Sequence, residues 1–180
     1  MPKWTVQAGV ALAGSALVLC ALVFAGRAAR DSLRPQDRYT AHFLDIACPA
    51  PPNLARADFL SEVQYEAGMP DELHLLDDDL PARLTGAFAR HPWVEQVEAV
   101  HLAPPNHVEV RLRFRAPALA VRQGEEMRAV DRHGIVLPKT AATGGLPVFR
   151  GKPQPPAGPA GKPWGDPAVE EAARTAGQTR

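Results

Sequence analysis

The chain has 180 residues, which leaves room for one domain or for a small domain with additional segments. Its 20 Lys and Arg residues balance 20 Asp and Glu residues, so no overall basic field favours nucleic acid as a partner. The 19 prolines are clustered, which indicates linkers between ordered segments rather than disorder along the whole chain.

An uncharged apolar run, Val6 to Ala25, follows a short tail of residues 1–5. At helical rise such a run measures about 30 Å, the thickness of the hydrocarbon core of a bilayer, so it predicts a transmembrane helix. A cleaved signal peptide is the alternative, with Val23 and Ala25 at the cleavage site, although the run is longer than a typical signal core. Residues 26–40 are expected to form a polar stalk, and their arginines would by themselves favour a cytoplasmic location for the following chain.

Residues 41–116 predict a small α+β domain in the order strand, helix, helix, strand, strand, with the two helices covering one face of a three-stranded sheet. His42 to Cys48 is rich in apolar residues and predicts the first strand. The segment from Ala55 to Gly68 repeats apolar residues every four positions and predicts the first helix, with Gly68 at its end. The second helix is predicted from Leu80 to Arg90, where a proline suits the first turn.

The segment from His91 to Arg115 predicts an antiparallel hairpin that is introduced by Trp93. Its second strand alternates apolar and polar residues from His107 to Arg115, which is the period of a strand with one buried face. Because so small a domain buries little core, we expect Trp93, Phe88 and Phe114 to carry a large share of its stability.

An ordered set of residues runs from the second predicted helix past the hairpin: Leu84 to Phe88, Pro92-Trp93-Val94, Val97, Pro105-Asn106, the alternation Val108-Val110-Leu112, and the exit segment Ala116 to Ala120. This order resembles the POTRA domain of the bacterial division proteins FtsQ and DivIB. The resemblance implies a non-enzymatic, single-pass protein of the cell inner membrane, with a cytoplasmic N-terminus and a periplasmic bulk. Its partners would be other membrane proteins of the division complex, which it would recruit or link at the septum.

Residues 117–151 resemble the beginning of the β domain of the same family and predict a partial antiparallel β domain. Strands are expected at Ala118 to Gln123, Met127 to Val130 and Ile135 to Leu137. Residues 152–180 predict a flexible or polyproline-like linker followed by a short helix. Family members continue into further strands beyond this helix, so the chain is expected to be either a shortened relative or a fragment.

Catalytic and metal-binding patterns are sparse. His101 and His107 flank the hairpin turn but have no third ligand at a familiar spacing, and the acidic run from Asp77 to Asp79 lacks the pattern of a calcium loop. Cys48 and His42 could pose as a nucleophile and its base, but no third group to orient them is evident. We therefore predict no enzyme activity, no cofactor, no metal, no small-molecule substrate and no nucleic acid.

The outer face of the hairpin is the predicted partner-binding surface. Arginines recur on its second strand, and cross-strand pairing with Glu95 and Glu98 is the structural alternative to a binding role. A partner could dock on this face or on a sheet edge, for example by adding a strand. A POTRA-like docking module of another envelope assembly or secretion pathway is the alternative function. The predicted partner-binding residues are Glu98, Val100, Arg111 and Arg113.

Overall fold

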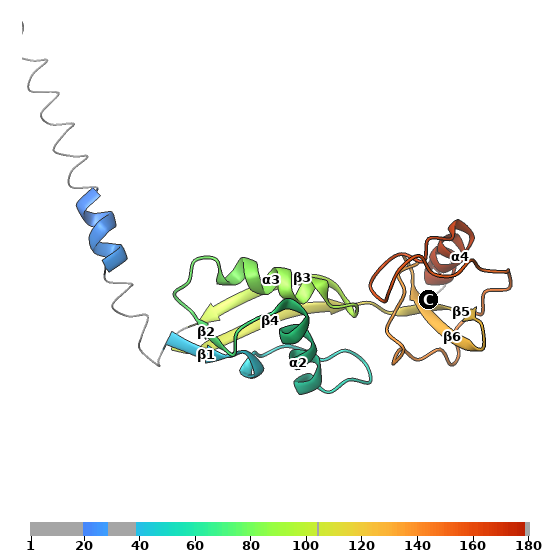
Figure 1. Ribbon diagram of the computed structural model, residues 1–180, viewed down its shortest axis with the longest axis horizontal. Coiled ribbons are helices and arrows are strands. Elements are labelled where there is room, and N and C mark those ends of the chain that lie inside the picture. The colour runs from blue at the N-terminus through green and yellow to red at the C-terminus, as the bar shows by residue number, and fades with distance from the viewer. Residues whose placement is uncertain (1–19, 29–38, 104, 179–180) are drawn as a thin grey trace, which may run out of the picture.

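The computed structural model describes residues 20–28, 39–103 and 105–178. These residues form a small α+β fold with four α-helical segments and three two-stranded antiparallel sheets (Figure 1). Beyond the helical residues 20–28, the chain builds two successive units. We call residues 39–116 the first unit and residues 117–178 the second unit.

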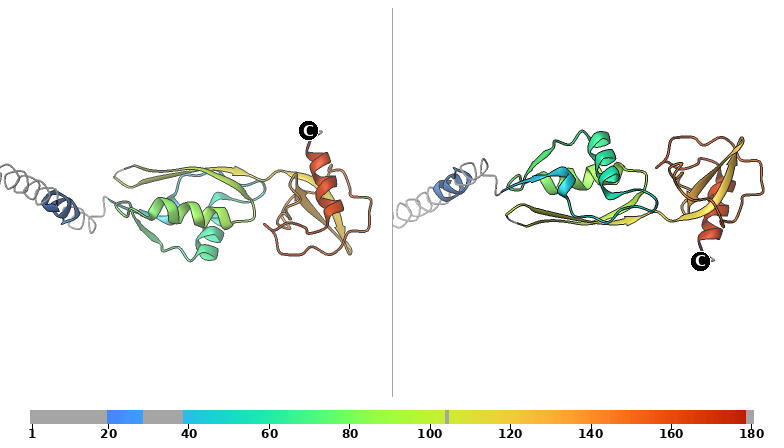
Figure 2. Two further views of the ribbon diagram at one scale, coloured as in Figure 1. Left: turned by 90° about the horizontal axis from the view of Figure 1, so that it is seen from above. Right: turned by 90° about the horizontal axis from the view of Figure 1, so that it is seen from below.

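The first unit alternates short strands with helices before it ends in a long hairpin. Both helices lie on one side of that hairpin (Figure 2). In chain order its elements are β1 (Thr40–His42), the 3-10 helix η2 (Phe43–Asp45), α2 (Arg56–Ala67), β2 (Glu72–His74), α3 (Leu80–Arg90), β3 (Val94–Ala103) and β4 (His107–Phe114).

The predicted three-stranded sheet is wrong. β1 pairs with β2, a strand between the two helices that the sequence did not predict, and β3 pairs with β4 in a separate sheet. The expected first strand is interrupted after His42, where the chain turns into η2 and buries Phe43 completely. Of that strand only Ala47 reaches the hairpin, through backbone hydrogen bonds to residues 108 and 110 of β4.

Both predicted helices of the first unit are confirmed. α2 ends before Gly68, which takes a left-handed φ of 63° that costs glycine little. α3 has the predicted bounds, with a proline in its first turn. Their buried faces meet around aromatic rings, and the ring of Phe59 lies 5.9 Å from that of Phe88 and 5.6 Å from that of Phe114.

The predicted hairpin is confirmed, and its second strand has the expected alternation. Val108 and Val110 are buried against the helices, whereas Arg111 and Arg113 are exposed. Two register shifts interrupt the ladder near the start of β3. Such bulges increase the twist of a strand pair and redirect individual side chains.

The second unit is built on a short hairpin and one helix. β5 (Pro117–Gln123) pairs with β6 (Glu126–Asp131), and α4 (Pro167–Gln178) packs on both strands. Isolated β-bridges extend this two-stranded ladder on both sides. Residue 148 bridges to β5, residue 136 bridges to β6, and residue 163 bridges to the neighbouring residue 135. The predicted strand from Ile135 to Leu137 therefore takes part only through single bridges.

Residues 152–164, which we call the strap, close the second unit. The sequence predicts a flexible or polyproline-like linker here, but Trp164 at its end is completely buried. The indole N–H of Trp164 donates to the carbonyl of Gln154 at 2.8 Å, and its backbone N–H donates to the carbonyl of Gly134 at 2.9 Å. The strap is thus an ordered part of the second core.

The predicted transmembrane helix is not found in the described fold. Among residues 20–28, 39–103 and 105–178, no helix is both long and apolar enough to cross a bilayer. Most of the predicted span, Val6 to Ala25, lies outside the described residues, and only its last six residues fall within the helical segment 20–28.

Candidate functional site

The two units meet where the hairpin passes into β5. Trp93, which we expected in the core of the first unit, is 1% exposed and packs instead with the second unit, against Ala120, Ala129 and Leu137. The indole N–H of Trp93 has no hydrogen-bond partner among the described residues. The backbone carbonyl of Trp93 accepts a hydrogen bond from the backbone N–H of Arg115 at 2.9 Å. A side chain that belongs to the first unit by sequence therefore completes the core of the second unit.

A set of ion pairs spans the same junction and centres on Glu95 of β3. Its carboxylate accepts from Arg132 of the second unit at 2.9 Å and lies 3.4 Å from both Arg113 of β4 and the ring of His133. Burial by itself would raise the pKa of Glu95. The hydrogen bond and charge of Arg132 lower this pKa, the charges of Arg113 and His133 lower it further, and together they exceed the effect of burial. The pKa of Glu95 therefore lies below its ordinary value.

Asp131, at the end of β6, organises the turn beside this ion pair. One carboxylate oxygen accepts from the backbone N–H groups of His133 and Ile135, at 2.8 and 2.9 Å. The other accepts from Arg115 at 2.8 Å, and the side chain of Asp131 is only 2% exposed. This pair ties the exit of the hairpin to the second unit, because Arg115 follows β4 directly.

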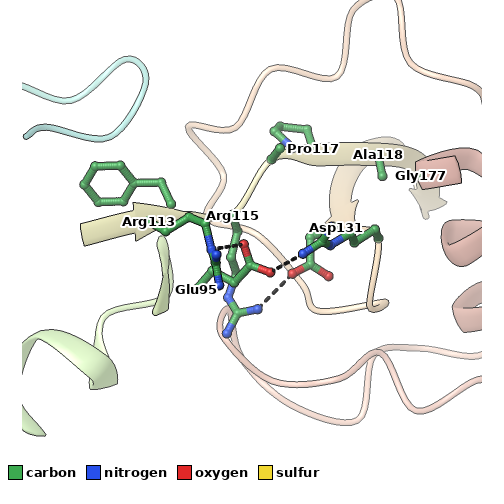
Figure 3. Close-up of a pocket in the computed structure, with 10 residues that line it drawn as sticks. Glu95, Arg113, Arg115, Pro117, Ala118, Asp131 and Gly177 are labelled. Carbon is green, nitrogen blue, oxygen red and sulfur yellow. Dashed lines mark hydrogen bonds and ion pairs between the residues drawn. The ribbon is translucent and has the colours of Figure 1, made fainter. Parts of the chain in front are cut away.

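A cleft of about 350 Å³ opens at this junction (Figure 3). In Figure 3, Glu95 lies beside Arg113, and Arg115 extends to Asp131. We call this space the junction cleft. Its lining consists of Glu95, the stretch from Arg113 to Ala118, Asp131, Arg132 and Gly177.

The last turn of α4 forms one wall of the junction cleft through a glycine. A Cβ atom added to Gly177 would stand 2.5 Å from the Cβ of Arg132, which is closer than two such atoms approach in proteins. Because this residue has no side chain, α4 can pack closely against the turn that carries Arg132. This close packing places Arg132 beside α4 in the lining of the cleft.

The structure divides the four predicted partner-binding residues among different surroundings. Arg113 lines the junction cleft, and Glu98 lies 3.9 Å from it, so the predicted cross-strand pairing with Glu95 and Glu98 is present. Arg111 instead pairs with Glu109 of its own strand at 3.0 Å. Val100 packs against the core of the first unit.

Sequence reasoning missed Arg115, Asp131 and Arg132 as parts of one site. The pattern from Asp131 to Gly134 predicts a turn, which the structure confirms, but the hydrogen bonds that the Asp131 carboxylate accepts from backbone groups there were not predicted. Nothing in the local pattern indicates that this turn faces β3, because the contact joins residues 37 positions apart.

The weaker chemical candidates are Cys48 and the residues considered for a metal site. Cys48 is half-buried, and this burial, partly offset by the charge of Arg56, raises the pKa of its thiol to about 11. The thiol is therefore protonated near neutral pH and a poor nucleophile. Over the described ranges, no group of three or more His, Cys, Asp or Glu residues is placed to hold a metal ion.

No protein-family model matches the chain, and no curated protein matches its sequence. The lining of the junction cleft combines paired charges with the apolar residues Phe114, Ala116, Pro117 and Ala118.

Proposed function

We propose that this protein is a non-enzymatic scaffold of the bacterial cell division complex, resembling FtsQ/DivIB, which recruits or links other division proteins at the septum. The support comes from the order of sequence features between Leu84 and Ala120. The observation that carries the proposal is the junction, because the segments Pro92-Trp93-Val94 and Ala116 to Ala120 both lie where the two units join.

The proposal places both units outside the cytoplasm, at the inner membrane, where membrane-anchored division proteins present their extracytoplasmic domains. A scaffold at this position needs surfaces of fixed relative orientation rather than a reactive centre. The paired charges around Glu95 and the buried Trp93 favour such a fixed orientation, since they connect β3 and β4 with the turn after β6.

Depletion of the protein in its native bacterium tests this function. The expected result is filamentous cells with failed septa, together with a midcell band of a fluorescent fusion to the full chain. A fusion carrying Trp93→Ala should lose the band if the junction is required, whereas Tyr65→Ser, at a side chain that is 89% exposed, should keep it.

Uniform membrane fluorescence with normal septation would contradict the proposal. Co-purification of the full chain with an outer-membrane barrel or a secretion component, in place of division proteins, would assign it to another envelope pathway.

A further inference from the structure

We propose that residues 150–156, which we call the proline segment, dock into a partner domain whose groove is lined by aromatic side chains and bears carboxylates at one end. The inference goes beyond the proposed function and does not depend on it. It concerns a surface of the second unit outside the junction cleft, and it is derived from the backbone, the contacts and the charges of this segment.

The backbone of the proline segment is restricted by its own sequence, which reads Arg-Gly-Lys-Pro-Gln-Pro-Pro. A proline ring fixes its own φ, and it also drives the preceding residue out of the α region into extended or polyproline II conformations. Every residue from Lys152 to Pro156 is a proline or stands directly before one. In the structure these residues run without helix, strand, turn or bend, as expected for a polyproline-like stretch.

The fold holds the middle of this stretch in place. The backbone N–H of Gln154 donates to the carboxylate of Asp166 at 3.0 Å, and its carbonyl accepts from the indole of the buried Trp164 at 2.8 Å. Asp166 also accepts from the backbone N–H of Ala168 at the start of α4. The stretch is therefore ordered before any partner arrives, which reduces the entropy lost on binding.

The outer side of the stretch offers what an aromatic groove binds. Polyproline II has three residues per turn, so Lys152 and Pro155 share one ridge, and Pro153 and Pro156 share the next. The first ridge is exposed and the second is half-buried. The backbone carbonyls of both ridges have no hydrogen-bond partner among the described residues, so they can accept from donors in a groove.

Positive charge accompanies the prolines and is not neutralised by the fold. Arg150, Lys152 and Arg122 are exposed, and none of them forms an ion pair within the part of the chain that the structure describes. Glu125, in the turn between β5 and β6, adds a single negative charge nearby in the chain. A groove of about 480 Å³ beside the segment has no carboxylate in its lining, which includes Arg122 and the stretch from Gly151 to Pro155. Carboxylates of a partner would complement this surface.

The spacing of these features favours a protein groove over an anionic bilayer or a nucleic acid. Arg150, Pro153 and Pro156 follow one another at intervals of three, which gives the pattern Arg-x-x-Pro-x-x-Pro. Proline-rich stretches of this kind bind the aromatic grooves of SH3 domains, because they are already extended and lose little entropy. A phosphate surface would use the cations and leave the prolines and their carbonyls unused.

The test uses a purified SH3 domain that binds Arg-x-x-Pro-x-x-Pro peptides as the probe. Its binding to the full chain in mild detergent is measured by isothermal titration calorimetry, and NMR of the labelled SH3 domain shows whether its groove is engaged. We expect a dissociation constant on the order of 100 µM. A free peptide of residues 149–158 should bind about threefold more weakly, because it is not held in place by the fold.

Variants of the full chain locate the binding. Pro156→Ala should weaken it about tenfold, and Arg150→Gln should weaken it about fivefold. Pro159→Ala and Lys162→Gln are the matched controls, because both residues are exposed and belong to the strap but lie outside the proline segment. These two should leave the affinity unchanged, and thermal unfolding of each variant verifies that the fold is retained.

Binding in the groove that is weakened by Pro156→Ala and Arg150→Gln, but not by the two controls, supports the proposal. Absence of binding, equal weakening by the controls, or binding of the free peptide without binding of the folded chain would overturn it. Weakening by Arg150→Gln alone, together with binding to phosphatidylglycerol vesicles, would also overturn it and assign the cations to an anionic surface. None of these measurements concerns midcell localisation, so their failure is separate from a failure of the proposed function.

Discussion

The two units are stabilised by cores of different kinds. The first unit has its own aromatic rings. Phe59 contacts the rings of Phe88 and Phe114, and Phe43 stacks on Phe88. The strands and helix of the second unit contain no Phe, Tyr or Trp and supply mainly Ala, Val and Leu. A core of small side chains needs large ones from elsewhere to fill it, because protein interiors are close-packed.

The second unit obtains these large side chains from irregular segments. Trp164 comes from the strap and packs under α4, whereas Trp93 comes from the first unit and packs on the opposite cluster. The indole N–H of Trp164 is hydrogen-bonded, but that of Trp93 has no partner among the described residues. Trp164 thus closes the second unit, and Trp93 couples the two units.

Trp164→Ala should give the largest loss of stability, about 3–5 kcal/mol, because it leaves a large cavity and frees the strap. Amide hydrogen exchange should show lost protection in β5, β6 and α4, while α2 and α3 keep most of theirs. Tyr65→Ala is the control, with an expected change within about 0.5 kcal/mol. Equal loss of protection in both units would show that their cores do not differ in this way.

Asp131→Ala should cost about 3 kcal/mol, because it removes the acceptor of two backbone N–H groups and leaves the mostly buried Arg115 without its carboxylate. Asp131→Asn keeps an acceptor oxygen and should cost less. Urea denaturation at neutral pH measures both variants. Equal stability of Asp131→Ala and the unchanged protein would show that this turn does not hold the junction.

Gly177→Ala in α4 and Gly86→Ala in α3 are the same substitution, but we expect them to change the free energy of unfolding in opposite directions. At Gly177 the new methyl group would collide with Arg132, so we expect a loss of about 1–2 kcal/mol. At Gly86 nothing lies within 4 Å, so the better helix propensity of alanine should add about 0.5–1 kcal/mol. Thermal unfolding distinguishes the two, and a shift of the same sign would contradict the close packing of α4 on the turn.

Glu95 should make a small, pH-dependent contribution, of about 1 kcal/mol or less. Since its pKa is lower in the folded protein, its stabilising effect is present above the unfolded value of about 4.3 and is lost as pH falls through the folded value. Glu95→Gln should therefore be less stable than the unchanged protein at pH 7, and the difference should disappear at strongly acidic pH. A difference that grows towards acidic pH would contradict the assignment, and Glu98→Gln serves as the more exposed comparison.

The periodic segments of this chain were predictable from sequence, and the irregular ones were not. α3 and the β3–β4 hairpin follow directly from their apolar spacing, because each buries one face against a neighbour. β2 was missed because three residues, with only Leu73 buried, are too short to show a period. The prediction of a three-stranded sheet was wrong for a related reason, since the burial of Phe43 interrupts the expected first strand.

The candidate site depends on contacts that no local pattern contains. The alternation of β4 placed Arg113 on the exposed face, but Val100 was assigned to the same surface although it packs against the core. The partnership of Glu95 with Arg132 joins two units. The strap illustrates the same limit, because its composition predicts an extended linker while the burial of Trp164 is determined by the sheet it covers.

The coupling of the two units through Trp93 is tested most directly by amide hydrogen exchange on the full chain carrying Trp93→Ala. We expect a loss of about 3–5 kcal/mol in overall stability, with the largest loss of protection in β5 and β6. Loss of protection confined to α2, α3 and the hairpin, with β5 and β6 unchanged, would show that Trp93 stabilises only the first unit.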